Sequence, residues 1–151
     1  MIKESDDIII KALARVVIPF IQIYALYVIM HGHYSPGGGF QGGVILGASI
    51  VLLVVTYGIK KAKVSNRFLS IFSSAGVLMY AGIGLLCLIL LGNFLDYNKL
   101  AAILPVKPAM ARSLGILGVE LGVGFAVMAV MVSIFYVIST GGDLSDIDGE
   151  D

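Results

Sequence analysis

Four long apolar runs constrain this chain more than any other feature. They cover residues 8–30, 40–59, 68–92 and 111–140, and each has at least the roughly 20 residues that a helix needs to cross a bilayer. Composition agrees, because 58% of the residues are hydrophobic and only 13% are charged, against about 25% charged in soluble domains. The sequence therefore predicts an all-α integral membrane protein, with four transmembrane helices in one domain over residues 1–151.

The charges of the loops predict the orientation. Residues 60–67 carry four basic side chains and no acid, whereas residues 31–43 carry no formal charge. Short loops rich in Lys and Arg stay on the cytoplasmic side, so four spans would leave both termini in the cytoplasm. The acidic tail, residues 141–151, is expected to be disordered or to contact a partner. The formal net charge of zero favours no nucleic-acid partner.

Residues 31–43, HGHYSPGGGFQGG, interrupt the apolar pattern between the first two runs. Each Gly costs about 1 kcal/mol and Pro about 3 kcal/mol inside a helix, so a loop is expected here. Glycine also lets the backbone approach other groups closely. The residues expected to matter in this loop are His31, His33, Pro36, Gly37, Gly38, Gly39, Phe40, Gly42 and Gly43.

Two short motifs in this loop do not predict a cofactor or a metal. Residues 37–42 match G-x-G-x-x-G, but no strand precedes them and no acid lies between Asp7 and Asp96, as a dinucleotide site requires. His31 and His33 form an H-x-H pair, whereas zinc needs three or four ligands and the chain has no other histidine. We expect both to bind backbone or lipid headgroups. A role in proton access stays open because histidine titrates near neutral pH.

Glu120 is the only carboxylate inside any of the four apolar runs. Its expected depth is about 12 Å from the start of the fourth helix, and an acid at such a depth is by default a functional hypothesis. Either it faces a partner helix or a hydrated path and pairs with Gln22 or another subunit's cation, or it is neutral and makes one interhelical hydrogen bond. Arg15 is expected to extend to the interface or meet a partner's acid.

Small residues form a row on the fourth apolar run. Gly118 and Gly122 make a G-x-x-x-G pair that Ala126 continues, which is typical of close helix packing. The sequence holds no nucleophile–base pair, so we predict a non-catalytic protein. One deep acid is too little for a complete cation transporter, which favours a subunit of a larger membrane complex.

Residues 28–43 also resemble the signature of a known protein family. The Gly-His, the polar pair and the Pro-Gly-Gly-Gly-Phe-x-Gly-Gly run resemble the signature of the MnhB/MrpB family, whose members belong to Mrp-type Na+/H+ antiporters. The resemblance implies an accessory membrane subunit that supports assembly and the passage of Na+ and H+ through the complex, with other membrane subunits as partners. Similar subunits occur in membrane-bound hydrogenase-type complexes, so a redox-driven complex is an alternative. An autonomous small channel or transporter is a second one.

Overall fold

Four long helices dominate the computed structural model, which describes residues 4–32, 37–62 and 64–141. The elements are α1 (Glu4–Met30), α2 (Gly39–Tyr57), α3 (Ile59–Ala62), α4 (Asn66–Ile89), the 3-10 helix η1 (Tyr97–Ala102) and α5 (Pro108–Ser139). The described residues contain no strand. By length and composition α1, α2, α4 and α5 can each cross a membrane, which confirms the predicted all-α fold.

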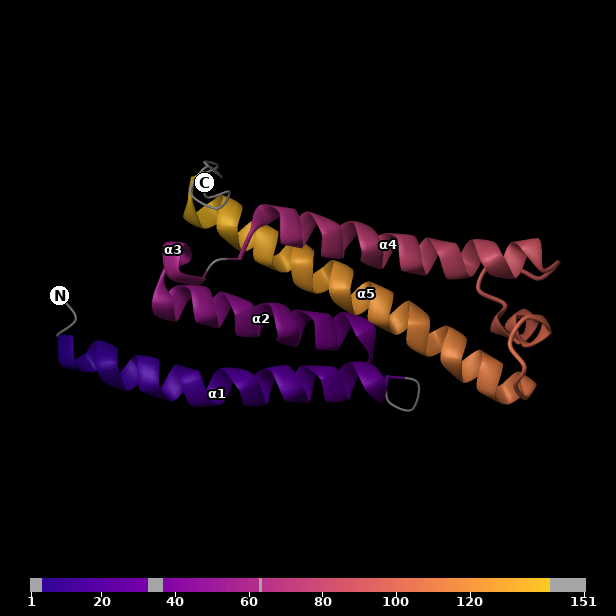
Figure 1. Cartoon of the computed structure of the whole chain (residues 1–151), viewed down its shortest axis with the longest axis horizontal. Helices are drawn as coiled ribbons and strands as arrows, with labels where there is room; N and C mark the ends of the chain where they lie inside the picture. The colour runs from indigo at the N-terminus through magenta and orange to yellow at the C-terminus, as the bar shows by residue number, and fades with distance from the viewer. Residues whose placement is uncertain (1–3, 33–36, 63, 142–151) are drawn as a thin grey trace.

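The longest helix, α5, is the element against which the others are arranged. It runs obliquely between α2 and α4 and contacts both, whereas α1 packs mainly on α2 (Figure 1). The start of α1 and the end of α5 lie at the same end of the bundle, which we call the terminal end (Figure 1). The opposite end, formed by the end of α4, by η1 and by the start of α5, is the apex end. An even number of spans explains why the start of α1 and the end of α5 lie at the same end of the bundle.

Local sequence sets where these helices begin and end. The last helix begins at Pro108, three residues earlier than predicted, because proline in the first turn needs no backbone donor. Helix α4 ends at Ile89, earlier than predicted. Leu91 there takes a left-handed φ of 61° and the Gly92 N–H returns to the Cys87 carbonyl at 3.1 Å, a helix-terminating arrangement. The connection between α4 and α5 contains the 3-10 helix η1.

Small residues let α4 and α5 approach at their crossing. A Cβ on Gly122 would lie 2.8 Å from the Gly76 carbonyl oxygen, and one on Gly76 would lie 2.8 Å from the backbone nitrogen of Ala126. A Cβ on Gly118 would lie 2.8 Å from Cδ1 of Ile83. The row of small residues on α5 therefore packs against α4 within the chain.

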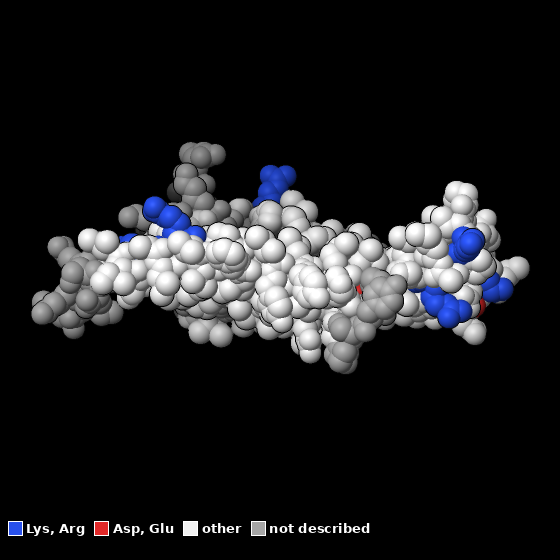
Figure 2. Space-filling view, turned by 90° about the horizontal axis from the view of Figure 1, so that it is seen from below, with Lys and Arg blue, Asp and Glu red and all other residues white. Residues whose placement is uncertain are grey.

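Most charged side chains on this face lie toward the two ends of the bundle, and one small acidic spot shows between them (Figure 2). Arg67 belongs to the first turn of α4 at the terminal end, and the Tyr57 hydroxyl, at the end of α2, donates to the Lys11 carbonyl at 3.3 Å. At the apex end, Arg112 donates to the Asn98 side-chain oxygen at 2.7 and 3.0 Å. This distribution marks the two polar boundaries of a membrane protein.

Candidate functional site

The loop between α1 and α2 meets α5 partway along its length rather than at its end (Figure 1). On the α1 side the chain stays helical, since the His31 N–H donates to the Tyr27 carbonyl at 3.0 Å. On the other side the Gly38 carbonyl accepts the first hydrogen bond of α2 from Gly42, at 2.9 Å. The predicted loop residues His33 and Pro36 lie outside the described residues.

The carboxylate of Glu120 lies against this loop. A Cβ on Gly32 would lie 2.5 Å from both Cδ and Oε2 of Glu120, and one on Gly38 would overlap Oε1 and lie 2.8 Å from Cδ. A Cβ on Gly39 would lie 2.8 Å from the backbone carbonyl carbon of Glu120. Gly32, Gly38 and Gly39 therefore form a glycine cradle around Glu120. A side chain at any of the three positions would overlap Glu120. Inside it, Oε2 of Glu120 is buried from solvent.

Two further glycines hold the helices around the cradle together. A Cβ on Gly42 would lie 2.9 Å from the Ala25 carbonyl oxygen, and one on Gly43 would lie 2.6 Å from the Gly124 carbonyl oxygen. Gly42 thus lets α2 approach α1, and Gly43 lets it approach α5. Close packing on both sides fixes the cradle relative to Glu120.

Gln22, one of the alternative partners considered for Glu120, lies away from its carboxylate. Gly32, which contacts the carboxylate, lies ten residues after Gln22, or about 15 Å along the helix. The expected depths assumed that all helices end at one level. In the structure α5 begins at Pro108, so Glu120 lies about 18 Å from its start. Its contacts with Gly32 and Gly38 show that the α1–α2 loop meets α5 at that depth and not at its end.

The other predicted polar residues lie on the outside of the bundle. The His31 ring is exposed and stacks on Tyr27, with ring centroids 4.2 Å apart. Arg15 is exposed on α1 and forms no ion pair with the described part of the chain. Phe40, at the start of α2, is 64% exposed. Of the predicted site residues, the structure therefore brings together Glu120, Gly38 and Gly39.

Sequence reasoning missed Gly32 as part of this site. In the sequence Gly32 is only the residue between two histidines, and nothing around it connects it to a residue 88 positions later. The described residues contain no group of three or more His, Cys, Asp or Glu side chains that could hold a metal ion. One buried carboxylate surrounded by backbone can exchange a proton or attract a cation, and it is not a preformed metal centre.

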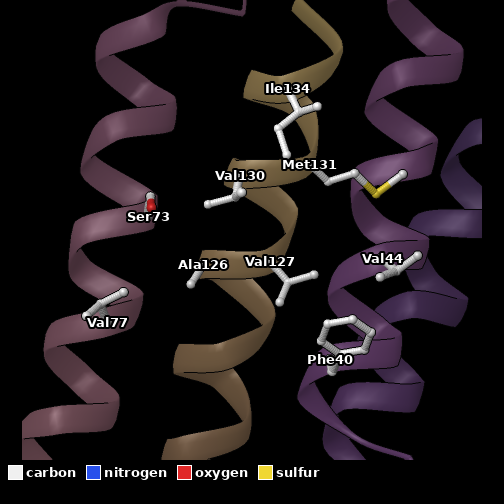
Figure 3. Close-up of a pocket in the computed structure, with 9 residues that line it drawn as sticks. All are labelled: Phe40, Val44, Ser73, Val77, Ala126, Val127, Val130, Met131 and Ile134. Atoms are coloured by element: carbon white, nitrogen blue, oxygen red, sulfur yellow. The ribbon is translucent and has the colours of Figure 1, made fainter.

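An apolar groove of about 410 Å³ lies on α5 between α2 and α4 (Figure 3). Phe40 lies at one end of the groove and Ile134 at the other, with Val127 and Val130 on its floor (Figure 3). Ser73 on α4 is the one polar residue of the lining. The groove therefore begins beside the first turn of α2, next to the glycine cradle.

Comparison with known proteins gives a consistent result. The family described as "Domain related to MnhB subunit of Na+/H+ antiporter" matches residues 9–133. A protein of Bacillus subtilis (strain 168) that is named as a Na(+)/H(+) antiporter subunit is 36% identical over 61 residues, which are 40% of this chain and 43% of that protein. "Putative antiporter subunit mnhB2" of Staphylococcus aureus (strain Newman) is 25% identical over 142 residues, covering 91% of this chain and 98% of that protein.

Proposed function

The chain belongs to the family of domains related to the MnhB subunit of Na+/H+ antiporters, and from this we propose that it is an accessory membrane subunit of a multisubunit Na+/H+ antiporter. Its relatives are named as antiporter subunits, which does not favour the redox-driven, hydrogenase-type alternative. Other membrane subunits are its partners, and Na+ and H+ are the ions that the whole complex exchanges.

The observation that supports a direct part in ion exchange is the Glu120 carboxylate in its glycine cradle. Intramembrane acids are costly and typically belong to ion or proton pathways. Gly32 and Gly38 leave room for this carboxylate, and Gly39 lets α2 approach the backbone of Glu120 on α5. We therefore assign to Glu120 the role of exchanging a proton, or attracting a cation, next to the path through the complex. The chain itself has no catalytic role in this proposal.

The test is Na+/H+ exchange by the assembled complex carrying Glu120→Gln. Glutamine keeps the size and hydrogen-bonding capacity of the side chain but cannot ionise. We expect exchange to fall at least about tenfold, the size of effect typical of a proton-transfer group, while the complex still assembles. Gln22→Leu is the matched control, since Gln22 lies about 15 Å from the cradle. Equal exchange rates in the two variants would remove Glu120 from the mechanism.

We also propose that both termini face the cytoplasm, because the basic loop of residues 60–67 lies at the terminal end. Single cysteines can test this in a background without Cys87. Arg67→Cys should be protected from a membrane-impermeant maleimide in intact cells, whereas Leu91→Cys, at a site that is 90% exposed at the apex end, should react. The opposite labelling pattern would invert the orientation.

A further inference from the structure

A second hollow, of about 450 Å³, lies toward the terminal end of the bundle, between α2, α3 and the start of α4. We call it the α3 pocket. Its lining residues are apolar except for one serine: Ile50, Leu53, Ala62, Val64, Ser65 and Phe68. Three of them, Ile50, Ala62 and Val64, also pack against the buried core that contains Val54 and Leu69. The core therefore holds the walls of the pocket in place.

The chain around these lining residues is strongly basic. Four cations lie near them in the sequence: Lys60, Lys61, Lys63 and Arg67. No acid occurs in residues 57–70. Arg67 is exposed in the first turn of α4, where the helix N-terminus adds partial positive charge. The Ser65 hydroxyl caps this turn by accepting a hydrogen bond from the Arg67 N–H at 3.2 Å. A positive stretch of chain thus borders an apolar pocket.

The polar ends of α5 give the depth of this pocket in the bilayer. Arg112, near the start of α5, and Thr140, which caps it, lie about 42 Å apart along the helix. That distance matches the roughly 40–45 Å thickness of a bilayer with its headgroups. The midplane then crosses α5 close to Ala126, halfway between them. Gly76 of α4 packs beside Ala126, so Ser65 lies about 17 Å from the midplane on the terminal side.

The α3 pocket crosses the boundary between hydrocarbon and headgroups, which lies about 15 Å from the midplane. Ser65 is just outside this boundary, and Phe68, about 12 Å from the midplane, is just inside it. On α2, Gly47 packs beside Met128, which places Ile50 about 8 Å from the midplane. The apolar walls therefore lie in the hydrocarbon region, and the basic stretch lies at the level of the headgroups.

An anionic phospholipid matches both parts of this arrangement. Its acyl chain suits the apolar walls, and its phosphate lies at the depth of the cations. A zwitterionic lipid offers the same acyl chain but no net charge to balance the cations. A helix of another subunit would remove those cations from water, which is costly unless the helix also supplies acids. Basic pockets between transmembrane helices typically bind anionic headgroups.

We propose that the α3 pocket binds an anionic phospholipid of the leaflet at the terminal end, with an acyl chain along Leu53 and Phe68 and the phosphate near Lys61 and Arg67. The site goes beyond the proposed ion exchange, because it requires only the position of the chain in a membrane. With the termini in the cytoplasm, this lipid belongs to the cytoplasmic leaflet, whose anionic lipids attract basic segments.

Photocrosslinking in a defined bilayer tests the site. The assembled complex carries p-benzoylphenylalanine in place of Phe68, which is 43% exposed in the pocket wall. It is reconstituted in nanodiscs of phosphatidylglycerol and phosphatidylcholine in equal amounts. The control position is Leu78, which is 70% exposed on the same helix and outside the pocket lining. Phosphatidylglycerol should be enriched several-fold among the adducts at position 68 and match its share of the bilayer at position 78.

A pair of double substitutions tests the cations. Each Lys or Arg near an anionic surface strengthens binding about fivefold. Lys61→Gln with Arg67→Gln should therefore lower the enrichment at position 68 to the level at position 78. Lys99→Gln with Lys107→Gln removes the same charge from exposed positions at the apex end and should leave the enrichment unchanged.

A larger side chain tests the hollow itself. Leu53→Trp places an indole ring in the pocket that Leu53 lines, and it should reduce all lipid adducts at position 68 several-fold. Val55→Trp adds the same ring on the same helix at a site that is 66% exposed and outside the lining. This variant should give as many adducts at position 68 as the complex without it.

Other outcomes would overturn the proposal. These are adducts at position 68 in the ratio of the bilayer, enrichment that survives the loss of both cations, and no lipid adduct at position 68 where position 78 gives one. Crosslinks to another subunit, or to the acidic residues 142–151 of this chain, would also replace the lipid as the occupant. The proposed function fails separately, since a complex that binds the lipid but shows no Na+/H+ exchange would keep this site and refute the antiporter role.

Discussion

Adding one methyl group at Gly39 tests the geometry of the cradle most directly. In the structure a Cβ there would lie 2.8 Å from the backbone carbonyl carbon and 2.9 Å from Cα of Glu120. These are backbone atoms of α5, so no side-chain rotation can relieve the overlap. Helices α2 and α5 must separate, or the first turn of α2 must unwind.

The magnitude follows from two opposing effects. Overpacking of a close contact costs about 1–3 kcal/mol, whereas replacing Gly by Ala inside a helix gains up to about 1 kcal/mol. We therefore expect Gly39→Ala to destabilise the protein by about 1–2 kcal/mol. For a chain of this length that corresponds to a decrease in melting temperature of about 2–8 °C.

The assay is thermal unfolding of the detergent-solubilised complex, and the chain provides a matched control. Gly82 lies on an exposed face of α4, where a Cβ would meet no atom within 4 Å. Gly82→Ala should therefore keep or raise the melting temperature. If Gly39→Ala is as stable as Gly82→Ala, the close approach of α2 to Glu120 described above is wrong.

Three more predictions concern the loop and the apex. Gly38→Leu should displace the Glu120 carboxylate and reduce Na+/H+ exchange while circular dichroism still reports intact helices; normal exchange would contradict the cradle. Joint replacement of His31 and His33 by Gln should leave exchange unchanged, because the exposed His31 ring stacks on an aromatic side chain, and a loss would assign proton access to these histidines. Burial raises the pKa of the Tyr97 phenol above its usual value of 10.0. The unfolded chain therefore loses this proton first, the free energy of unfolding falls as pH rises above about 10, and Tyr97→Phe should reduce that fall in an alkaline stability titration.

Much of the fold could be predicted from the sequence because a bilayer imposes a simple rule. A helix satisfies its own backbone hydrogen bonds, so apolar runs of spanning length predict helices without knowledge of their neighbours. Helix ends were less predictable. They depend on local geometry such as the proline at the start of α5 and the left-handed Leu91 at the end of α4.

The candidate site likewise has features that the sequence predicts and a contact that it does not. The glycine loop and Glu120 each stand out from the sequence, one as a break in hydrophobicity and the other as an acid in an apolar run. Their contact does not, since it depends on where the α1–α2 pair stops against α5. Gln22 illustrates the difference, because the depth expected from its position in the first helix placed it beside a carboxylate that in fact lies near Gly32.

The sequence by itself therefore determined the four helices and the family, because hydrophobic length and the pattern of the glycine loop are properties of continuous segments. Only the tertiary structure decided the depth at which the α1–α2 loop meets α5, the cradle around Glu120 and the groove between α2 and α4. Those features come from packing at particular glycines, such as Gly43 against Gly124 and Gly76 against Gly122. Packing of this kind depends on which surfaces meet, and the order of residues along one helix does not contain that information.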